Sequence, residues 1–280
     1  MEEKRNFDLL TLGQVLLRLS PPNNDRLVRG DTFVKQVGGA ELNVAVGVAL
    51  LGLRTGVISK LPSHDMGSFM KGKIRSYGVS DDFFMYDDSP SARVGIYYYE
   101  NGAYPRKPKV IYDRANSSFY SLKIDEIPEK AYTASRCFHT SGITLALSPK
   151  VRETAIEMIK RFKAAGTLVS FDVNFRGNLW TGEEAKECIE QILPYVDIFF
   201  CSEDTARLTF KKTGTAREMM KSFTEEYPIS IVASTQRIVH SPKSHTFGSI
   251  IYDARKDIYY EEEPYRDIDV VDRIGSGDAY

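Results

Sequence analysis

The sequence predicts an α/β fold with a mostly parallel central sheet. Two observations predict it: short apolar segments typical of strands alternate with longer runs of helix formers, and glycines stand where the helices would end. The apolar strand Asp8–Leu12 is followed by a helix over Ala40–Leu51, which Gly52 closes as a C-cap. A strand over Thr55–Lys60 and a helix over Asp65–Tyr77 come next. Such alternation is typical of parallel strands joined by crossover helices.

The same alternation returns in the second half of the chain. The predicted helix Pro149–Ala165 has a proline in its first turn and Gly166 after its end, as helix boundaries favour. A short polar turn near the C-terminus joins two strands that we expect to pair antiparallel. The predicted strands here are 136–140, 167–172, 198–201, 229–234, 248–253 and 258–262, with a second helix over 181–193 and the end of a strand at 270–271.

Residues 91–114 interrupt this rhythm. Two tyrosine-rich segments, Arg93–Glu100 and Lys109–Arg114, flank Asn101-Gly102-Ala103 and are typical of a β-hairpin. A hairpin inside an α/β alternation usually lies off the main sheet. We therefore expect a small β-lid formed by about residues 14–37 and 91–114. Besides the hairpin, its strands would lie near 15–20 and 33–37.

Composition limits the class of partner. The chain has 280 residues, of which 42% are hydrophobic, and this suits one large domain. With 37 basic and 38 acidic residues and no long basic run, nothing favours nucleic acid or an anionic membrane as partner, so we expect a small molecule. The spacing of Cys137, Cys188 and Cys201 fits neither a disulfide framework nor a metal cluster, and the N-terminus lacks a signal-peptide core. These features predict a reduced, cytoplasmic protein.

The segment Gly275-Ser276-Gly277-Asp278 carries the strongest chemical signal. Glycines let successive N–H groups converge at a helix N-terminus, and such a turn binds phosphate oxygens. Asp278 is then placed to accept a proton from an attacking hydroxyl. By itself, the segment is equally compatible with a strand–helix turn in which Asp278 only caps the helix. Because the sequence stops at Tyr280, within the first turn of that helix, we expect the chain to be C-terminally incomplete.

A second glycine segment precedes the first predicted helix. Gly38 and Gly39 allow close approach of a ligand to the backbone, and Asn43 can bind a hydroxyl or a neighbouring loop. Taken alone, two glycines at a helix entry are more often structural.

Together, these two segments resemble the two signatures of the PfkB carbohydrate kinases, and the predicted lid falls where that family has its lid. The resemblance covers all 280 residues. It implies a ribokinase-like three-layer sandwich with a mostly parallel central sheet and a small β-lid. Within the family the likeness is strongest to 2-keto-3-deoxygluconate kinases, and it is carried by the segments Val37–Asn43, His139–Thr144, Ala146–Pro149 and Asp172–Arg176.

The resemblance also implies a role for each matching residue, with ATP and Mg²⁺ as cofactors. Asp278 would be the catalytic base. The sugar would contact Gly39, Asn43, Tyr97, Tyr112, Arg114 and Arg176. The anion hole and nucleotide phosphates would be held by Asn174, Arg176, Ser202, Gly275, Ser276 and Gly277. Tyrosines on a lid also serve packing or a dimer surface, and we expect a homodimer or higher homo-oligomer through the β-lid.

Three positions depart from the family pattern. Arg273 stands where a threonine is usual, and Thr235-Gln236-Arg237 replaces a lysine- and glycine-rich donor loop. Ser202-Glu203-Asp204-Thr205 takes the place of an N-x-x-E segment that helps to organise magnesium. Glu203 or Asp204 would substitute there, and the metal ligands stay unassigned.

The expected function is ATP-dependent phosphorylation of 2-keto-3-deoxygluconate at its terminal hydroxyl. Glu41, where related kinases carry a small residue, and the pair Arg114 and Arg176 favour an acidic sugar. The alternatives are another PfkB sugar kinase, of fructokinase or ribokinase type, and a non-catalytic sugar-acid-binding protein derived from a kinase. No G-x-G-x-x-G follows the first strand, which excludes a Rossmann oxidoreductase. Three further residues are expected to serve packing: His139, Trp180 and Cys201.

Overall fold

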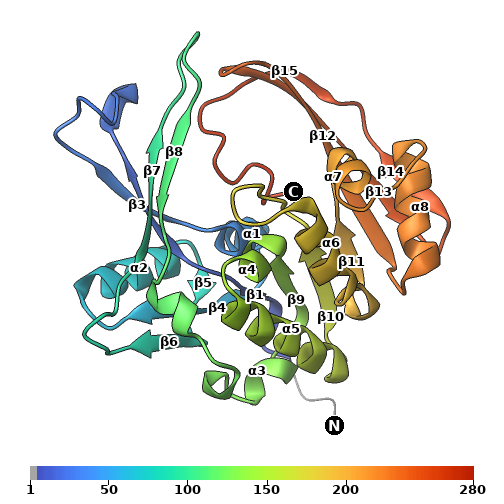
Figure 1. The fold of residues 1–280 in the computed structure, drawn as a ribbon, viewed down its shortest axis with the longest axis horizontal. Coiled ribbons are helices and arrows are strands. Elements are labelled where there is room, and N and C mark those ends of the chain that lie inside the picture. Colours follow the sequence, from blue (N-terminus) through green and yellow to red (C-terminus); the bar gives the residue numbers. More distant parts are fainter. Residues whose placement is uncertain (1–4) are drawn as a thin grey trace.

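The computed structural model of this chain describes residues 5–280 and has an α/β architecture (Figure 1). Its strands are β1 (Phe7–Leu12), β2 (Leu16–Ser20), β3 (Val34–Gly38), β4 (Thr55–Pro62), β5 (Val79–Ser80), β6 (Phe84–Asp87), β7 (Gly95–Glu100), β8 (Lys109–Asp113), β9 (Ser135–Ser141), β10 (Leu168–Asp172), β11 (Ile198–Phe200), β12 (Ile231–Ser241), β13 (Ser244–Asp253), β14 (Ile258–Glu261) and β15 (Tyr265–Asp269). Its α-helices are α1 (Ala40–Leu50), α2 (Asp65–Ser76), α3 (Lys130–Thr133), α4 (Gly142–Ala146), α5 (Pro149–Ala164), α6 (Gly182–Glu190), α7 (Glu203–Leu208) and α8 (Ala216–Glu226).

The main sheet runs in the order β14-β13-β12-β11-β10-β9-β1-β4-β5. From β12 to β5, every neighbouring pair on this path is parallel. β13 pairs antiparallel with β12, β14 and β15. The predicted fold, a mostly parallel sheet that ends in an antiparallel pair, is confirmed.

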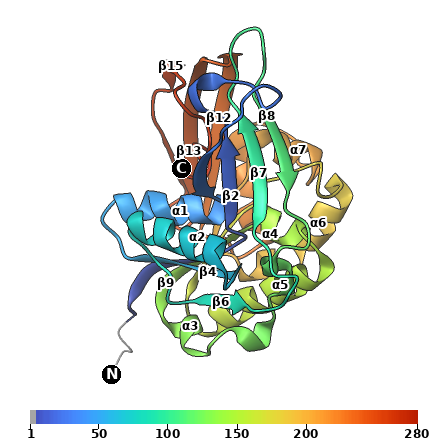
Figure 2. The same ribbon diagram turned by 90° about the vertical axis from the view of Figure 1, so that its left-hand side faces the viewer.

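Strand β4 shows why helices cover both faces of this sheet. Val57 belongs to an apolar cluster that includes Leu42 of α1 and Met70 of α2, whereas the next residue, Ile58, belongs to the cluster around Val151 of α5. Successive side chains of a strand point to opposite faces, so apolar residues at both positions require cover on both sides. Helices α1 and α2 lie on one side and α4, α5 and α6 on the other (Figure 2). This gives the expected three layers.

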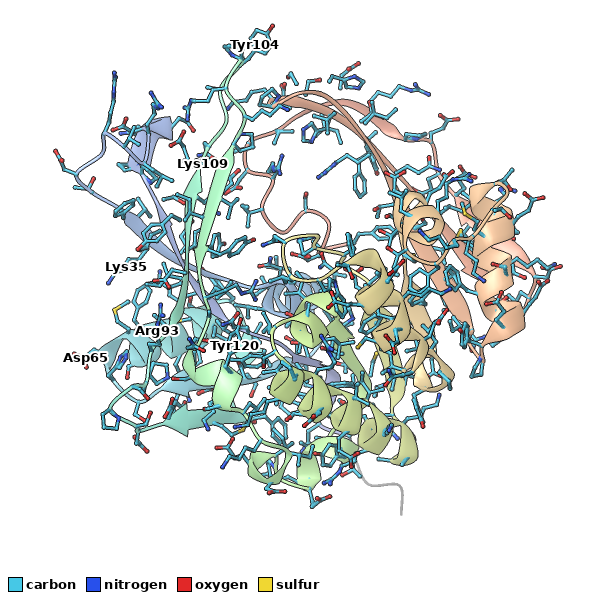
Figure 3. All side chains as sticks on the ribbon, viewed as in Figure 1. Lys35, Asp65, Arg93, Tyr104, Lys109 and Tyr120 are labelled. Carbon is cyan, nitrogen blue, oxygen red and sulfur yellow. The ribbon has the colours of Figure 1, made fainter. Side chains whose placement is uncertain are left out.

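A second sheet, in the order β3-β2-β7-β8, forms the lid. β2 pairs antiparallel with β3 and parallel with β7, and β7 and β8 form the predicted hairpin. The hairpin rises from the main body, with Arg93 near its base and Tyr104 at its tip (Figure 3). The expected β-lid is confirmed.

Other expectations near the C-terminal half need correction. β12 extends to Ser241 and β13 begins at Ser244, so both strands are longer than predicted, and they form a hairpin that was not predicted. The outer half of β12 is exposed, and its polar residues interrupt the apolar pattern of a strand. Val270–Val271 was predicted as the end of a strand, but β15 ends at Asp269. The prediction also missed α8, although Thr215 and Glu218 form a capping box at its start. No helix within residues 5–280 is long and apolar enough to cross a membrane.

Candidate active site

A cleft of about 630 Å³ lies between the lid and the carboxyl ends of the parallel strands. Its walls come from the lid strand β8, from the loops after β10 and β11, from β12 and from the turn 272–280. Every residue that the sequence assigned to catalysis, sugar binding or nucleotide binding lines this cleft: Gly39, Asn43, Tyr97, Tyr112, Arg114, Asn174, Arg176, Ser202, Gly275, Ser276, Gly277 and Asp278. The fold therefore brings together residues from both ends of the chain.

Two amide side chains hold the carboxylate of Asp278. Asn43 Nδ2 donates to Asp278 Oδ2 at 2.8 Å, and Asn174 Nδ2 donates to Asp278 Oδ1 at 3.3 Å. Asn43 stands in the first turn of α1, and Asn174 follows β10 in a left-handed conformation with φ of 37°. Both amides donate to lone pairs of the carboxylate, so they orient Asp278 as a proton acceptor. The sequence predicted that Asn43 binds a sugar hydroxyl or a neighbouring loop and that Asn174 faces the nucleotide phosphates; in this structure both side chains contact Asp278.

The turn before Asp278 has the backbone that its glycines allow. Gly275 has φ of 78°, and Ala279 N donates to Gly275 O at 2.9 Å as in one turn of α-helix. Within residues 5–280, the N–H groups of Gly277 and Asp278 have no hydrogen-bond acceptor. Unpaired donors at a helical turn suit an anion.

Gly39 is required because there is no room for a side chain at its position. Its φ is 147°, and a Cβ at this position would lie 2.6 Å from the carbonyl oxygen of Gln14. Only glycine lets the backbone pass Gln14 and enter α1 at this point. This close packing gives Gly39 a structural role beside its predicted contact with the sugar.

The lid wall of the cleft presents one guanidinium between aromatic rings. Arg114 donates from Nε to Gln14 Oε1 at 2.7 Å, and its guanidinium lies 5.4 Å from the ring centre of Tyr112. Tyr97 lies beside Tyr112, with ring centres 6.0 Å apart, and burial raises the pKa of Tyr97 to about 12. Burial also lowers the pKa of Arg114. Its terminal nitrogens make no hydrogen bond with the described residues, and a guanidinium with both of these nitrogens free can bind a carboxylate through two parallel bonds.

Two carboxylates in the cleft, Glu41 and Asp172, were not among the site residues assigned from the sequence, which used Glu41 only as a sign of an acidic sugar. Glu41 is buried, and its Oε1 accepts from Ser141 Oγ at 2.6 Å and from Thr144 Oγ1 at 2.8 Å. Burial raises the pKa of Glu41. Asp172 ends β10, and burial, reinforced by the charge of Asp278, raises its pKa to about 7. These two carboxylates and the two hydroxyl residues that bind Glu41 all lie in segments that carried the family resemblance. That resemblance is the signal in the sequence that points to them.

The side of the cleft for which the sequence predicts nucleotide contacts begins at α7. The hydroxyl of Ser202 caps this helix, because it accepts from Thr205 N at 3.2 Å and bonds Thr205 Oγ1 at 2.9 Å. Asp204 lines the cleft, whereas Glu203 bonds Arg207 at 2.8 Å outside it. Among residues 5–280, no group of three or more His, Cys, Asp or Glu side chains is placed to hold a metal ion.

An ion pair connects the lid with the turn 272–280. Arg18 on β2 lies 2.9 Å from Asp272, and its guanidinium also stacks 4.6 Å from the ring centre of Tyr99. Arg18 is buried and Asp272 is partly exposed. Asp272 Oδ1 accepts from Ile274 N at 2.9 Å, which fixes the start of the turn. Nothing in the spacing of the sequence indicated this pair.

The residues expected to serve packing do so. His139, Trp180 and Cys201 are buried, and the latter two belong to the main apolar cluster. His139 bonds Ser170 Oγ at 2.9 Å, and burial lowers its pKa to about 4. His139 is therefore neutral at physiological pH.

Comparison with known proteins decides the family. The sequence profile of the pfkB family of carbohydrate kinases matches residues 6–280. The chain belongs to this family. It is 33% identical over 273 residues to 2-dehydro-3-deoxygalactonokinase of Haloferax volcanii, covering 98% of this chain and 81% of that protein. It is 26% identical over 279 residues to 5-dehydro-2-deoxygluconokinase of Listeria monocytogenes, covering 99% of this chain and 82% of that protein.

Solved structures of PfkB kinases have the same architecture. The crystal structure of 2-dehydro-3-deoxygluconokinase from Thermotoga maritima superposes with a TM-score of 0.91 and 31% identity, over 98% of this chain and 83% of that one. A fructokinase from Xylella fastidiosa, 21% identical with a TM-score of 0.78, was solved with ATP. A putative ribokinase II from E. coli, 20% identical with a TM-score of 0.80 over 98% of this chain and 83% of that one, has the same fold and was solved with ATP and Mg²⁺. The chain is thus a carbohydrate kinase related to kinases of dehydro-deoxy sugar acids.

Proposed function

We propose that this kinase transfers the γ-phosphoryl group of ATP to the terminal hydroxyl of 2-keto-3-deoxygluconate. The observation that carries the proposal is the arrangement of one cleft. The carboxylate of Asp278 accepts hydrogen bonds from two amides and lies beside a turn with two unpaired N–H groups. Arg114 lines the same cleft from the lid, and its terminal nitrogens make no hydrogen bond with the described residues. A base next to an anion site fits phosphoryl transfer, and a lid arginine fits a substrate that carries a carboxylate.

In this reaction Asp278 takes the proton of the attacking hydroxyl while the oxygen of that hydroxyl bonds to the γ-phosphorus. The bond between the γ-phosphorus and the bridging oxygen of ADP breaks, so that phosphosugar and ADP leave. The N–H groups of Gly277 and Asp278, together with Arg176, offset the charge on the transferring group. Tyr97 and Tyr112 cover the sugar from the lid.

Mg²⁺ would enter with the nucleotide, where it neutralises phosphate charge. Asp204 is the acidic side chain of the Ser202–Thr205 segment that lines the cleft. A single carboxylate together with phosphate oxygens and water is a usual environment for this ion. Asp204 is therefore favoured over Glu203, which pairs with Arg207.

2-Keto-3-deoxygalactonate is the second candidate substrate. The relative from Haloferax volcanii, 33% identical, is named for this sugar acid, which differs from the first in the configuration at one carbon. Both candidates present the same carboxylate and the same terminal hydroxyl, so Arg114 and Asp278 suit either. The side chains that contact the hydroxyls between these ends decide the preference.

A coupled kinase assay with MgATP over 2-keto-3-deoxygluconate, 2-keto-3-deoxygalactonate, fructose and ribose tests the proposal. The expected result is a kcat/KM at least about 100-fold higher for the better keto-deoxy acid than for either neutral sugar, since an unpaired buried guanidinium penalises a neutral ligand. Fructose or ribose as best substrate would make the kinase one of fructokinase or ribokinase type. Sugar-acid binding without turnover would indicate a non-catalytic binding protein.

Two further properties go with this proposal. The three free cysteines fit a reducing compartment, which supports a cytoplasmic location. The lid also exposes Phe33, Val34 and Ile111, which supports a homodimer or higher homo-oligomer through the β-lid. Light scattering on the chain and on Ile111→Glu tests this, and a monomer in both cases would contradict it.

A further inference from the structure

Four arginines line the cleft, and none of them has a carboxylate within 4.0 Å among the described residues: Arg114, Arg176, Arg237 and Arg273. Arg114 belongs to the lid wall. Arg176 donates only to the carbonyl of Phe175, and the side chains of Arg237 and Arg273 make no hydrogen bond within residues 5–280. Arg176, Arg237 and Arg273 are exposed to solvent, and together with Arg114 they give the cleft a positive charge that attracts an anionic ligand.

Arg237 reaches the cleft from the extended part of β12. Ala233, Thr235 and Arg237 all line the cleft, as expected for alternate residues of one strand. Arg237 stands opposite Phe247 of β13, whose ring centre lies 6.3 Å from that of Tyr280. Arg237 is thereby placed next to the turn that carries Asp278.

Arg273 reaches the cleft from the start of that turn. Its neighbours on both sides are fixed, because Asp272 pairs with Arg18 and accepts from the N–H of Ile274. The carbonyl of Arg273 also accepts from Ser276 Oγ at 3.0 Å. Partial burial, and then the charges of Arg273 and Arg176, lower the pKa of Arg237, so the three guanidiniums act on one another.

The position of β12 decides which substrate these arginines meet. The lid and Gln14 stand next to β1, and three strands, β9, β10 and β11, separate β1 from β12. Four strand spacings amount to roughly 19 Å between the axes of these strands. Arg237 therefore lies toward the opposite end of the cleft from Gln14 and its partner Arg114, on the side from which a second substrate would approach Asp278.

We propose that Arg237 and Arg273, together with Arg176, form the site that binds the triphosphate of the nucleotide donor. The site rests on the proposed kinase function and adds two residues to it, both at positions where the chain departs from the family pattern. Guanidiniums match phosphate oxygens through paired hydrogen bonds, and three positive charges complement a triphosphate. The preferred donor is thus selected by its chain of phosphates.

Titration calorimetry on the chain, with ATP, AMP and inorganic tripolyphosphate as ligands, tests the site. We compare Arg237→Gln, Arg273→Thr and the double variant with Arg266→Gln, an exposed arginine on β15 that does not line the cleft. Each single variant should weaken ATP and tripolyphosphate about 10-fold and the double variant about 100-fold, as expected for charge-assisted hydrogen bonds. Affinities for AMP and for the sugar acid should stay within about threefold, and Arg266→Gln should leave all of them unchanged.

Unchanged ATP affinity in both single variants would overturn the assignment, and so would equal losses for AMP and ATP, which indicate a damaged fold. A loss of affinity confined to the sugar acid would show that the arginines bind the sugar acid instead of the nucleotide.

If the chain phosphorylates a sugar acid while the variants bind ATP normally, the proposed triphosphate site is wrong and the proposed kinase function stands. If the variants weaken ATP as expected but no sugar acid is phosphorylated, the function fails and the site stands. A chain that binds neither ATP nor tripolyphosphate contradicts both.

Discussion

Asn43 Nδ2 lies 2.8 Å from Asp278 Oδ2, although 235 residues separate the two in the chain. This contact joins the two glycine-rich segments of the sequence into one site. Asn43 is carried by the first turn of α1, whose entry depends on Gly39, and the Cβ of any residue replacing Gly275 would come within 3.1 Å of the Asn43 amide. The glycines of both segments therefore allow the approach that lets the Asn43 amide orient the carboxylate of Asp278, which we propose as the base.

Asp278→Asn should leave sugar-acid affinity within a few-fold and lower kcat by about 10²–10⁴, the usual contribution of a general base. Calorimetric titration of the sugar acid and steady-state kcat check this. A decrease in kcat of less than tenfold would show that another residue is the base. Asp172, whose pKa is raised to about 7, is the carboxyl group that would then be examined.

Asn43→Ala should lower kcat about 10-fold with a smaller change in KM, because the carboxylate of Asp278 loses one of its two orienting donors. Asn174→Ala should act in the same direction, since it releases the other oxygen. Steady-state kinetics and thermal unfolding of both variants check this. A loss of kcat accompanied by unfolding at assay temperature would make Asn43 a structural residue only.

Arg114→Gln should raise KM for the sugar acid about 10–100-fold and reduce the preference over fructose, because the lid loses the group that pairs with the carboxylate. Arg93→Gln is the matched control: Arg93 also lies on the lid but bonds Asp113 at 2.7 Å and does not line the cleft. If both variants lose activity equally, the effect belongs to the lid as a whole. If Arg114→Gln prefers the sugar acid over fructose as strongly as the parent does, another residue contacts the carboxylate of the sugar acid.

The sequence predicted those parts of the fold that depend on local pattern. The helix at Pro149–Ala164 starts at its proline after the Ser148 cap, and the hairpin 95–113 turns where glycine and prolines stand. It did not predict the full length of β12, because Gln236, Arg237 and His240 give its outer half a polar pattern. That half is stabilised by its pairing with β13, which is a tertiary effect.

The residues of the site fall into the same two groups, those that a local motif predicts and those that only the fold brings together. Motif residues such as Asp278 and Gly275 were assigned from the sequence, and they line the cleft. The pair Arg18–Asp272 was not found, because the two residues belong to separate elements and only the fold brings them together. Gln14 was missed for a similar reason, since its amide receives its role from Arg114 and Ser117, about 100 residues further along the chain.

Asp272→Asn should destabilise the protein by about 1 kcal/mol and lower kcat, because it leaves the buried guanidinium of Arg18 without its carboxylate and loosens the start of the catalytic turn. Thermal unfolding and kcat check this together. Arg106→Gln provides the control, since Arg106 pairs with Glu100 toward the tip of the lid, away from the cleft. If Arg106→Gln lowers stability and kcat as much as Asp272→Asn does, the ion pair of Arg18 and Asp272 has no special effect on kcat and only helps to hold the lid.

Asp172 predicts how stability depends on pH. Its folded pKa of about 7 lies above the ordinary value of 3.8, chiefly through burial and then through the charge of Asp278. Between these two values the folded state keeps a proton that the unfolded state has lost, so stability falls as pH rises through this window and the full cost is present above about pH 7. Replacing the carboxyl by an amide removes this cost.

Asp172→Asn should therefore stabilise the protein relative to the parent, and the difference in unfolding free energy should grow by on the order of 2 kcal/mol between pH 5 and pH 8. The amide oxygen of the variant still accepts from Asn174 N, which Asp172 Oδ1 does at 2.9 Å, so the local turn is kept. Denaturant unfolding at pH 5, 6, 7 and 8 measures the difference, and Asp31→Asn, at an exposed aspartate, controls for removal of a carboxylate. A difference that stays constant or shrinks toward pH 8 would show that Asp172 is already ionised at pH 5 and that the cleft solvates it.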